Sequence, residues 1–103
     1  MNDKTLLELA AKAAGIAAHT FIDGSFLHIL HGQIVARWNP LDDDGDALRL
    51  AVMLEIELKF NDAGVAARAK YFDVWQGSMR TDDKNRAVRY VITKAAAEVG
   101  KAA

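Results

Sequence analysis

The sequence predicts a single α+β domain over residues 1–103, with three helices and about five strands in the order α-β-β-β-α-β-β-α. Three segments repeat their apolar residues with the spacing of a helix, and the segments between them alternate apolar and polar residues around short turns. Because hairpins join most of the strands, we expect a mainly antiparallel sheet with helices on one or both of its faces.

The composition is typical of a folded globular chain, with 51% apolar and 26% charged residues. A net charge of −1 predicts no general attraction to nucleic acids or anionic membranes. The absence of cysteine excludes disulfides and cysteine-based zinc or nucleophile sites. Since the sequence has no long apolar run and residues 1–4 lack the pattern of a signal peptide, we expect no membrane span and a cytoplasmic location.

The first helix is expected from about Asp3 to Ala14. Asn2, Asp3 or Thr5 can cap its start, and Gly15 is a favourable stop, because glycine tolerates the positive φ that often follows a helix. Its buried face is predicted from residues spaced by three or four positions: Leu6, Leu9, Ala10 and Ala13.

A meander of three strands is expected next, over residues 16–22, 26–30 and 33–37. Asp23-Gly24 favours a two-residue hairpin turn, because both central positions of that turn need positive φ. Such a turn places Phe21 opposite Phe26 and His19 opposite His28. A three-residue loop that includes Ser25 would shift this register by one residue, so two registers stay open.

The segment from Trp38 to Ala51 ends the meander and opens the second helix. Pro40 fixes its own φ and holds Asn39 out of the helical region, so the chain turns here. One of Asp42, Asp43 and Asp44 is expected to cap a helix over about residues 43–54, and the other carboxylates lie at the positive end of its dipole. Its apolar stripe is predicted to be Ala47, Leu48, Ala51, Val52 and Leu54.

This segment also carries a resemblance. Trp38-Asn39-Pro40-Leu41, followed over residues 43–51 by Asp-Asp-Gly-Asp-Ala-Leu-Arg-Leu-Ala, resembles a family of small tailed-phage and prophage proteins. The segments from Leu6 to Gly15 and from Arg86 to Gly100 fit the same family, which is described as an α/β/α ("ABA") sandwich domain of unknown function. The resemblance implies that fold and a phage origin, and it supplies no active site.

A second hairpin is expected after the second helix. Residues 55–60 alternate cleanly, residues 61–64 form the turn, and the return strand runs over residues 65–75. A register that pairs Phe60 with Val65 places Glu57 opposite Arg68 and Glu55 opposite Lys70, so charged and apolar side chains separate onto opposite faces. From Tyr71 onward the alternation is lost, which predicts a bulge or a strand covered on both faces.

The third helix is expected to be the longest, with about 18 residues. Thr81 is predicted to cap it, with Asp82 and Asp83 in its first turn, after a loop over residues 76–80. Gly100 is expected to end it. Its buried stripe is predicted to be Ala87, Val88, Val91, Ile92, Ala95 and Val99.

Two groups of residues belong to types that bind metals. His19, His28 and His31 fall in one hairpin, but a zinc site needs three or four convergent ligands, and His31 has the wrong alternation to join the other two. The four aspartates from Asp42 to Asp46 lack the spacing of an EF-hand loop. We therefore interpret the histidines as ordinary strand and turn residues and the aspartates as helix-capping groups, with a metal site as the alternative.

The sequence offers no catalytic constellation. The two serines, Ser25 and Ser78, both fall in turns, and neither lies in a nucleophile elbow. Neither standard glycine-rich phosphate loop is present. We expect no catalytic residue, no bound cofactor and no enzymatic activity.

Two other features indicate binding. Large aromatic side chains are numerous for so small a domain, and they either complete the core or form an interface: Trp38, Tyr71, Phe72 and Trp75. Cationic residues on the polar side of the third helix are candidate phosphate contacts, although nearby acidic residues dilute their charge: Arg86, Arg89 and Lys94.

These observations predict a non-enzymatic protein-interaction module that forms a homodimer, since an unpaired strand edge in a small sheet favours pairing with a second copy. Its further partner is an unidentified phage or host macromolecule. The alternative is a nucleic-acid-binding protein that uses the cationic face of the third helix. A metal-dependent enzyme is the third and least favoured hypothesis.

Overall fold

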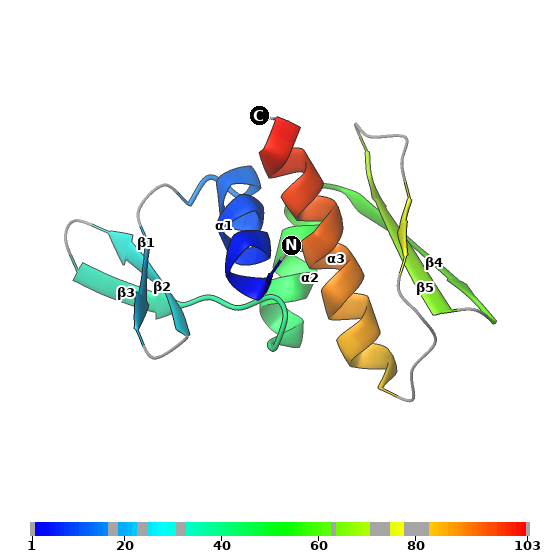
Figure 1. Cartoon of the computed structure of the whole chain (residues 1–103), viewed down its shortest axis with the longest axis horizontal. Helices are drawn as coiled ribbons and strands as arrows, with labels where there is room; N and C mark the ends of the chain where they lie inside the picture. Colours follow the sequence, from blue (N-terminus) through cyan, green and yellow to red (C-terminus); the bar gives the residue numbers. More distant parts are fainter. Residues whose placement is uncertain are drawn as a thin grey trace.

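A computed structural model describes residues 2–16, 19–22, 25–30, 33–62, 64–70, 75–77 and 83–102. The α+β class and the predicted element order are confirmed, with one short strand, β6, added where a loop was predicted (Figure 1). The elements are α1 (Asp3–Ala13), β1 (His19–Ile22), β2 (Ser25–Leu30), β3 (Gln33–Arg37), α2 (Asp44–Met53), β4 (Ile56–Asn61), β5 (Gly64–Ala69), β6 (Gln76–Gly77) and α3 (Lys84–Ala102).

The strands form two separate antiparallel sheets, β1-β2-β3 and β4-β5-β6, where one sheet of about five strands was expected. Figure 1 shows the three helices between these two sheets, so the layers run sheet, helices, sheet and differ from those of an α/β/α sandwich. The physical reason is the turn at Asn39-Pro40 and the helix that follows it. They carry the chain away from β3 before β4 begins, so the two groups of strands never meet.

The first sheet is anchored to α1 through Phe26, which is fully buried against Leu7 and Ala11. Its ring lies 5.2 Å from the rings of both Phe21 and Trp38, measured between centroids. The β1–β2 register pairs Phe21 with Phe26 and His19 with His28, which confirms the two-residue turn. Residues 23 and 24 of that turn lie outside the described residues.

Asn2 is the N-cap of helix α1, and its side chain accepts a hydrogen bond of 2.8 Å from the backbone N–H of Thr5. Gly15 adopts a φ of +79° directly after the helix, as predicted for its stop. The buried residues are Leu6, Leu7, Ala10 and Ala11. The predicted buried face left out Leu7 and Ala11, and it included Leu9 and Ala13, which are only partly buried. The difference arises because α1 is covered on two sides, by α3 and by the first sheet.

Helix α3 differs from the prediction at both ends. The carboxylate of Asp83 accepts a hydrogen bond of 2.9 Å from the backbone N–H of Arg86, so Asp83 caps the helix and the prediction of a cap at Thr81, itself outside the described ranges, is wrong. The prediction that Gly100 ends the helix is also wrong, because α3 continues to Ala102 and Gly100 is buried inside it. A Cβ atom at Gly100 would come within 1.9 Å of the carbonyl oxygen of Leu9, so glycine permits the close contact of α3 with α1.

The second sheet packs on α3 through β5. Val65, Ala67 and Ala69 alternate inward and are buried, and Val65 and Ala67 share a core cluster with α3 residues that include Ala87 and Val91. The predicted register is confirmed, since Phe60 pairs with Val65 and Glu57 with Arg68. The outer face carries the ion pairs that this register implies, Glu57–Arg68 and Glu55–Lys70.

Candidate interaction surface

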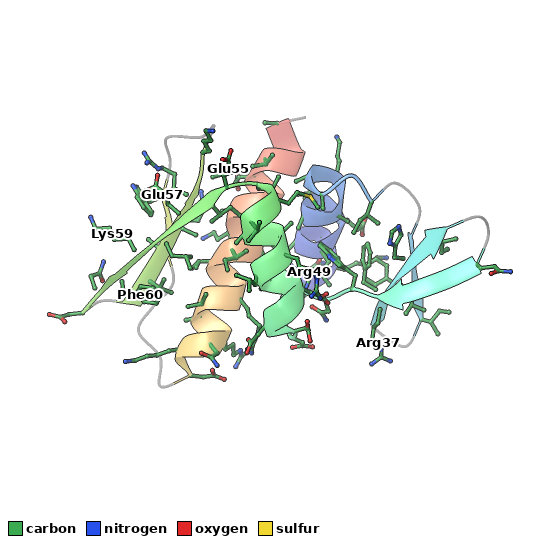
Figure 2. All side chains as sticks on the ribbon, turned by 180° about the vertical axis from the view of Figure 1, so that it is seen from behind. Arg37, Arg49, Glu55, Glu57, Lys59 and Phe60 are labelled. Atoms are coloured by element: carbon green, nitrogen blue, oxygen red, sulfur yellow. The ribbon has the colours of Figure 1, made fainter. Side chains whose placement is uncertain are left out.

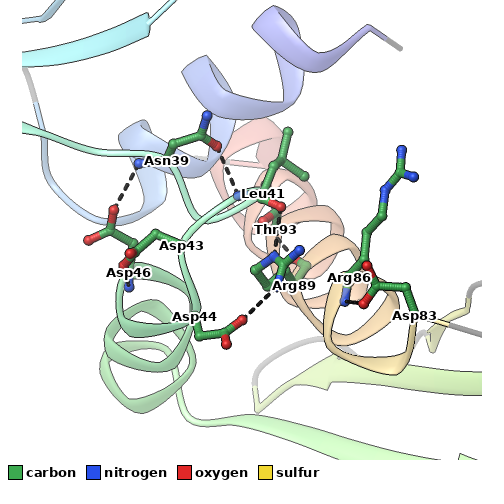
Figure 3. A network of polar contacts seen from close by, with 9 residues as sticks. All are labelled: Asn39, Leu41, Asp43, Asp44, Asp46, Asp83, Arg86, Arg89 and Thr93. Carbon is green, nitrogen blue, oxygen red and sulfur yellow. Dashed lines mark hydrogen bonds and ion pairs between the residues drawn. The ribbon is translucent and has the colours of Figure 1, made fainter.

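The acidic segment before α2 is a structural cap (Figure 3). Asp43 is the N-cap, and its carboxylate accepts a hydrogen bond of 2.7 Å from the backbone N–H of Asp46. The carboxylate of Asp46 accepts one of 2.9 Å from the backbone N–H of Asn39, and the side-chain oxygen of Asn39 accepts one of 3.0 Å from the N–H of Leu41. These bonds fix the turn that leads from the first sheet into α2, and they confirm the capping interpretation.

Arg89 joins α3 to this turn. Its Nε donates to the carbonyl oxygen of Leu41 at 2.9 Å, and its Nη1 lies 2.6 Å from Oδ1 of Asp44 (Figure 3). Only 15% of the Arg89 side chain is exposed. Of the three predicted phosphate contacts, Arg89 is therefore held in a structural contact. Arg86 and Lys94 lie on one stripe of α3, on either side of Tyr90.

The candidate metal ligands within the described residues do not converge on one point, and the aspartates among them already contact other protein groups. In the described ranges, no three His, Cys, Asp or Glu side chains lie close enough together to hold a metal ion. Asp42 contacts the Asn39 amide nitrogen at 3.3 Å, and Arg49 lies 2.6 Å from Asp46 and 3.8 Å from Asp43. The backbones of His19 and His28 are paired across β1 and β2, and His31 lies outside the described residues.

The predicted aromatic interface is only partly described. Trp38 is partly buried and packs against Phe26, so it contributes to the core that anchors the first sheet. Trp75 is 38% exposed, and the Arg68 guanidinium lies 5.1 Å from its ring centroid, which places it on the outer face of the second sheet. Tyr71 and Phe72 lie outside the described residues.

Helix α2 exposes an apolar stripe that was predicted to be buried. Leu48 and Val52 are 64% and 69% exposed, while Leu50 takes the buried position between Ala47 and Ala51. Asp44 reaches Arg89 on α3, and Leu48 and Val52 follow it at i+4 and i+8. They therefore continue along the side of α2 on which Asp44 meets α3, and no described residue covers them.

Strand β4 exposes a second apolar row. Leu58 and Phe60 pair with Ala67 and Val65, so they point to the inner face of the sheet. Helix α3 covers β5 but leaves Leu58 and Phe60 38% and 63% exposed. In the described sheet, β4 is also the edge strand, with a neighbour only in β5.

The two rows lie on neighbouring elements. The chain passes from α2 to β4 through a tight turn at Leu54 and Glu55, and Glu55 has a φ of +50°. Figure 2 shows α2 and β4 diverging from this turn on the same side of the molecule, with α3 behind them. Val88 of α3 and Ile56 of β4 pack against both inner clusters, so the cores beneath α2 and beneath the second sheet are continuous. We call Leu48, Val52, Leu58 and Phe60 the α2/β4 surface.

No sequence pattern indicates this surface, because each of its four residues fits an ordinary buried stripe or strand face. A pocket lies between α1 and the Asn39 turn, but Asn39 and Asp42 in its wall are already hydrogen-bonded to each other. No helix in the described parts of the chain has the length and apolar character needed to cross a membrane. In comparisons with protein families, curated proteins and solved structures, nothing matches this chain.

Proposed function

We propose that the chain is a non-enzymatic protein-interaction module that self-associates through the α2/β4 surface. The observation that carries this proposal is the exposure of four large apolar side chains on two adjacent elements, one of which is the edge strand of the second sheet as described. Exposed apolar residues that gather on one side of a small protein are typical of interaction sites, whereas single exposed apolar residues are common everywhere.

The energy available is that of a moderate, reversible complex. Each of the four side chains is still 38–69% exposed, so burying it contributes on the order of 1 kcal/mol. Eight such side chains in a dimer supply roughly 8 kcal/mol, which is similar to the association cost of about 4–15 kcal/mol. We therefore expect a dimer that forms with the help of further contacts and dissociates on dilution.

The resemblance to small phage proteins completes the proposal. The assembled module acts in the cytoplasm of a bacterial host, where it binds a phage or host macromolecule. Binding of nucleic acid by the cationic face of α3 is less favoured, because Arg89 is held by Leu41 and Asp44 and only two of the three expected phosphate contacts remain. Salt-dependent retention of the protein on DNA would reverse this preference.

Light scattering behind a sizing column tests the proposal on a double variant, Leu48→Gln with Val52→Gln. Both positions are exposed, so the variant retains its fold and loses apolar contact area only. We expect the wild type to approach twice the chain mass of 11.3 kDa with rising concentration, and the variant to stay near 11.3 kDa.

Met53→Gln is the matched control, because Met53 is also exposed on α2 but lies off the Leu48–Val52 stripe. We expect the Met53→Gln variant to show the same solution mass as the wild type at each concentration. A double variant that associates as strongly as the wild type would refute the α2/β4 surface as the interface.

A further inference from the structure

We propose that the partner on the α2/β4 surface is a second copy of the chain, bound by antiparallel pairing of the two β4 strands about a two-fold axis at Leu58. The inference rests on the proposed self-association and specifies its geometry. The two copies would form one continuous sheet in the order β6-β5-β4-β4-β5-β6.

The free edge of β4 is suited to strand pairing. In an antiparallel pair, alternate residues direct their N–H and C=O groups away from the neighbouring strand. The β4–β5 register runs without interruption from Ile56 to Asn61, so β4 has neither the bulge nor the proline that commonly protects an edge. Half of its residues therefore present backbone groups that a second strand can bind.

The charges of β4 are complementary to those of a second β4 strand that lies antiparallel to it. When Leu58 lies opposite Leu58 of the second copy, Glu57 lies opposite Lys59 of that copy, and Lys59 lies opposite its Glu57. Opposite charges in directly facing positions stabilise a strand pair. Within the described chain, Lys59 has no ion-pair partner of its own, whereas Glu57 contacts Arg68. The second copy supplies the missing partner twice in each dimer.

The same charges disfavour the neighbouring registers. Two like strands related by a two-fold axis shift in steps of two residues, because an odd shift turns the side chains to the opposite face. A step in one direction places Glu57 opposite Glu57, with Lys59 opposite Glu55, which lies in the turn before β4 and is already paired with Lys70. A step in the other direction places Lys59 opposite Lys59. Like charges in facing positions are destabilising, so the register centred on Leu58 is selected.

This pairing also joins the exposed apolar rows of the two β4 strands. A two-fold axis perpendicular to the sheet keeps the inner faces of both copies on the same side. Ile56 then faces Phe60 of the second copy, and the two Leu58 side chains face each other, so the exposed inner row of β4 continues across the axis. Leu48 and Val52 of both copies lie on that same side of the joined sheet.

Charge reversal gives a test with an internal rescue. Lys59→Glu makes the facing pairs Glu–Glu, and Glu57→Lys makes them Lys–Lys, so each variant alone should dimerise about tenfold more weakly than the wild type. Mixed in equal amounts, the two variants restore Glu–Lys pairs in the heterodimer. We expect sedimentation of the mixture to recover the dimer affinity of the wild type.

Lys12→Glu and Glu8→Lys are the matched controls, because they make the same charge changes at exposed positions on α1. Neither control should alter the affinity, alone or mixed. Thermal melting checks that each variant is folded, and recovery in the mixture would itself require folded chains.

A wild-type dimer that neither charge reversal weakens, or that the mixture fails to restore, overturns the β4 pairing and leaves self-association by another geometry. A wild type that remains at 11.3 kDa at every concentration overturns both the pairing and the proposed self-association.

Discussion

Gly100→Ala should destabilise the protein, although the same change favours most helices. An added Cβ would lie 1.9 Å from the Leu9 carbonyl oxygen and 2.8 Å from its carbonyl carbon. Both atoms belong to the backbone of α1, so no side-chain rotation relieves the contact. The oxygen must retreat to at least 3.0 Å, the closest approach that real Cβ atoms show, and α1 must move with it.

The expected magnitude follows from two opposing terms. Replacing glycine by alanine inside a helix stabilises it by about 1 kcal/mol. Overpacking of a close contact costs about 1–3 kcal/mol, and the upper part applies here because α1 and α3 share the most extensive interface between helices of the described chain. We expect a net loss of roughly 1–2 kcal/mol, which lowers the melting temperature of a domain this size by about 5–15 °C.

Thermal unfolding followed by circular dichroism measures this change. Gly45→Ala is the matched control, because Gly45 lies in α2 and its added Cβ would meet side-chain atoms of Arg49 and Asp43 at 3.2 Å and no backbone of another helix. That variant should be neutral or slightly more stable. Should Gly100→Ala raise the melting temperature as Gly45→Ala does, the close packing of α3 on Leu9 would be refuted.

Substitutions of Asp43 and Arg89, each with a comparison variant, test the contacts that position α2. Asp43→Ala should cost about 1 kcal/mol of unfolding free energy because it removes the N-cap, whereas Asp42→Ala, which loses only an exposed 3.3 Å contact, should be near neutral in urea denaturation. Equal effects at both positions would contradict the assignment of the cap. Arg89→Met should cost about 2 kcal/mol, because it leaves the Leu41 carbonyl without its donor, and Arg89→Lys should recover only part of this, since lysine lacks the forked geometry. Full recovery by lysine would show that charge alone matters there.

Local features were predictable from the sequence because adjacent residues determine them. The register of the second hairpin followed from one condition, that Glu57 meets Arg68 while Phe60 meets Val65, and the structure confirms it. The two-residue turn between β1 and β2 was one of two registers that the sequence left open. The cap of α2 was likewise narrowed to three aspartates, among which backbone geometry selects Asp43.

Features that depend on distant contacts were not predictable in this way. Ala47 and Ala51 belong to two overlapping apolar stripes of α2, one with Leu48 and Val52 and one with Leu50, and periodicity cannot choose between them. The choice depends on where α3 lies. Arg89 was interpreted as a free cation because its partner, Asp44, lies 45 residues earlier in the chain.

The candidate site was missed for the same reason. Trp38 and Trp75 drew attention through their size, yet the exposed apolar surface comprises aliphatic residues and Phe60, whose spacing is typical of a buried face. Their exposure follows from the limited reach of α3, which covers β5 and leaves β4 open. The split into two sheets depends in turn on helices that pack between them, which hairpin patterns alone do not specify.

Hydrogen exchange along β4, measured below and above the concentration of dimer formation, tests the central claim most directly. In the described sheet, the N–H groups of β4 that point away from β5 face no second strand, and they gain a strand partner in the paired dimer. We predict that alternate amides from Ile56 to Phe60 become protected as the concentration rises, while β5 is unchanged. Protection of β4 that stays the same at every concentration would contradict the account.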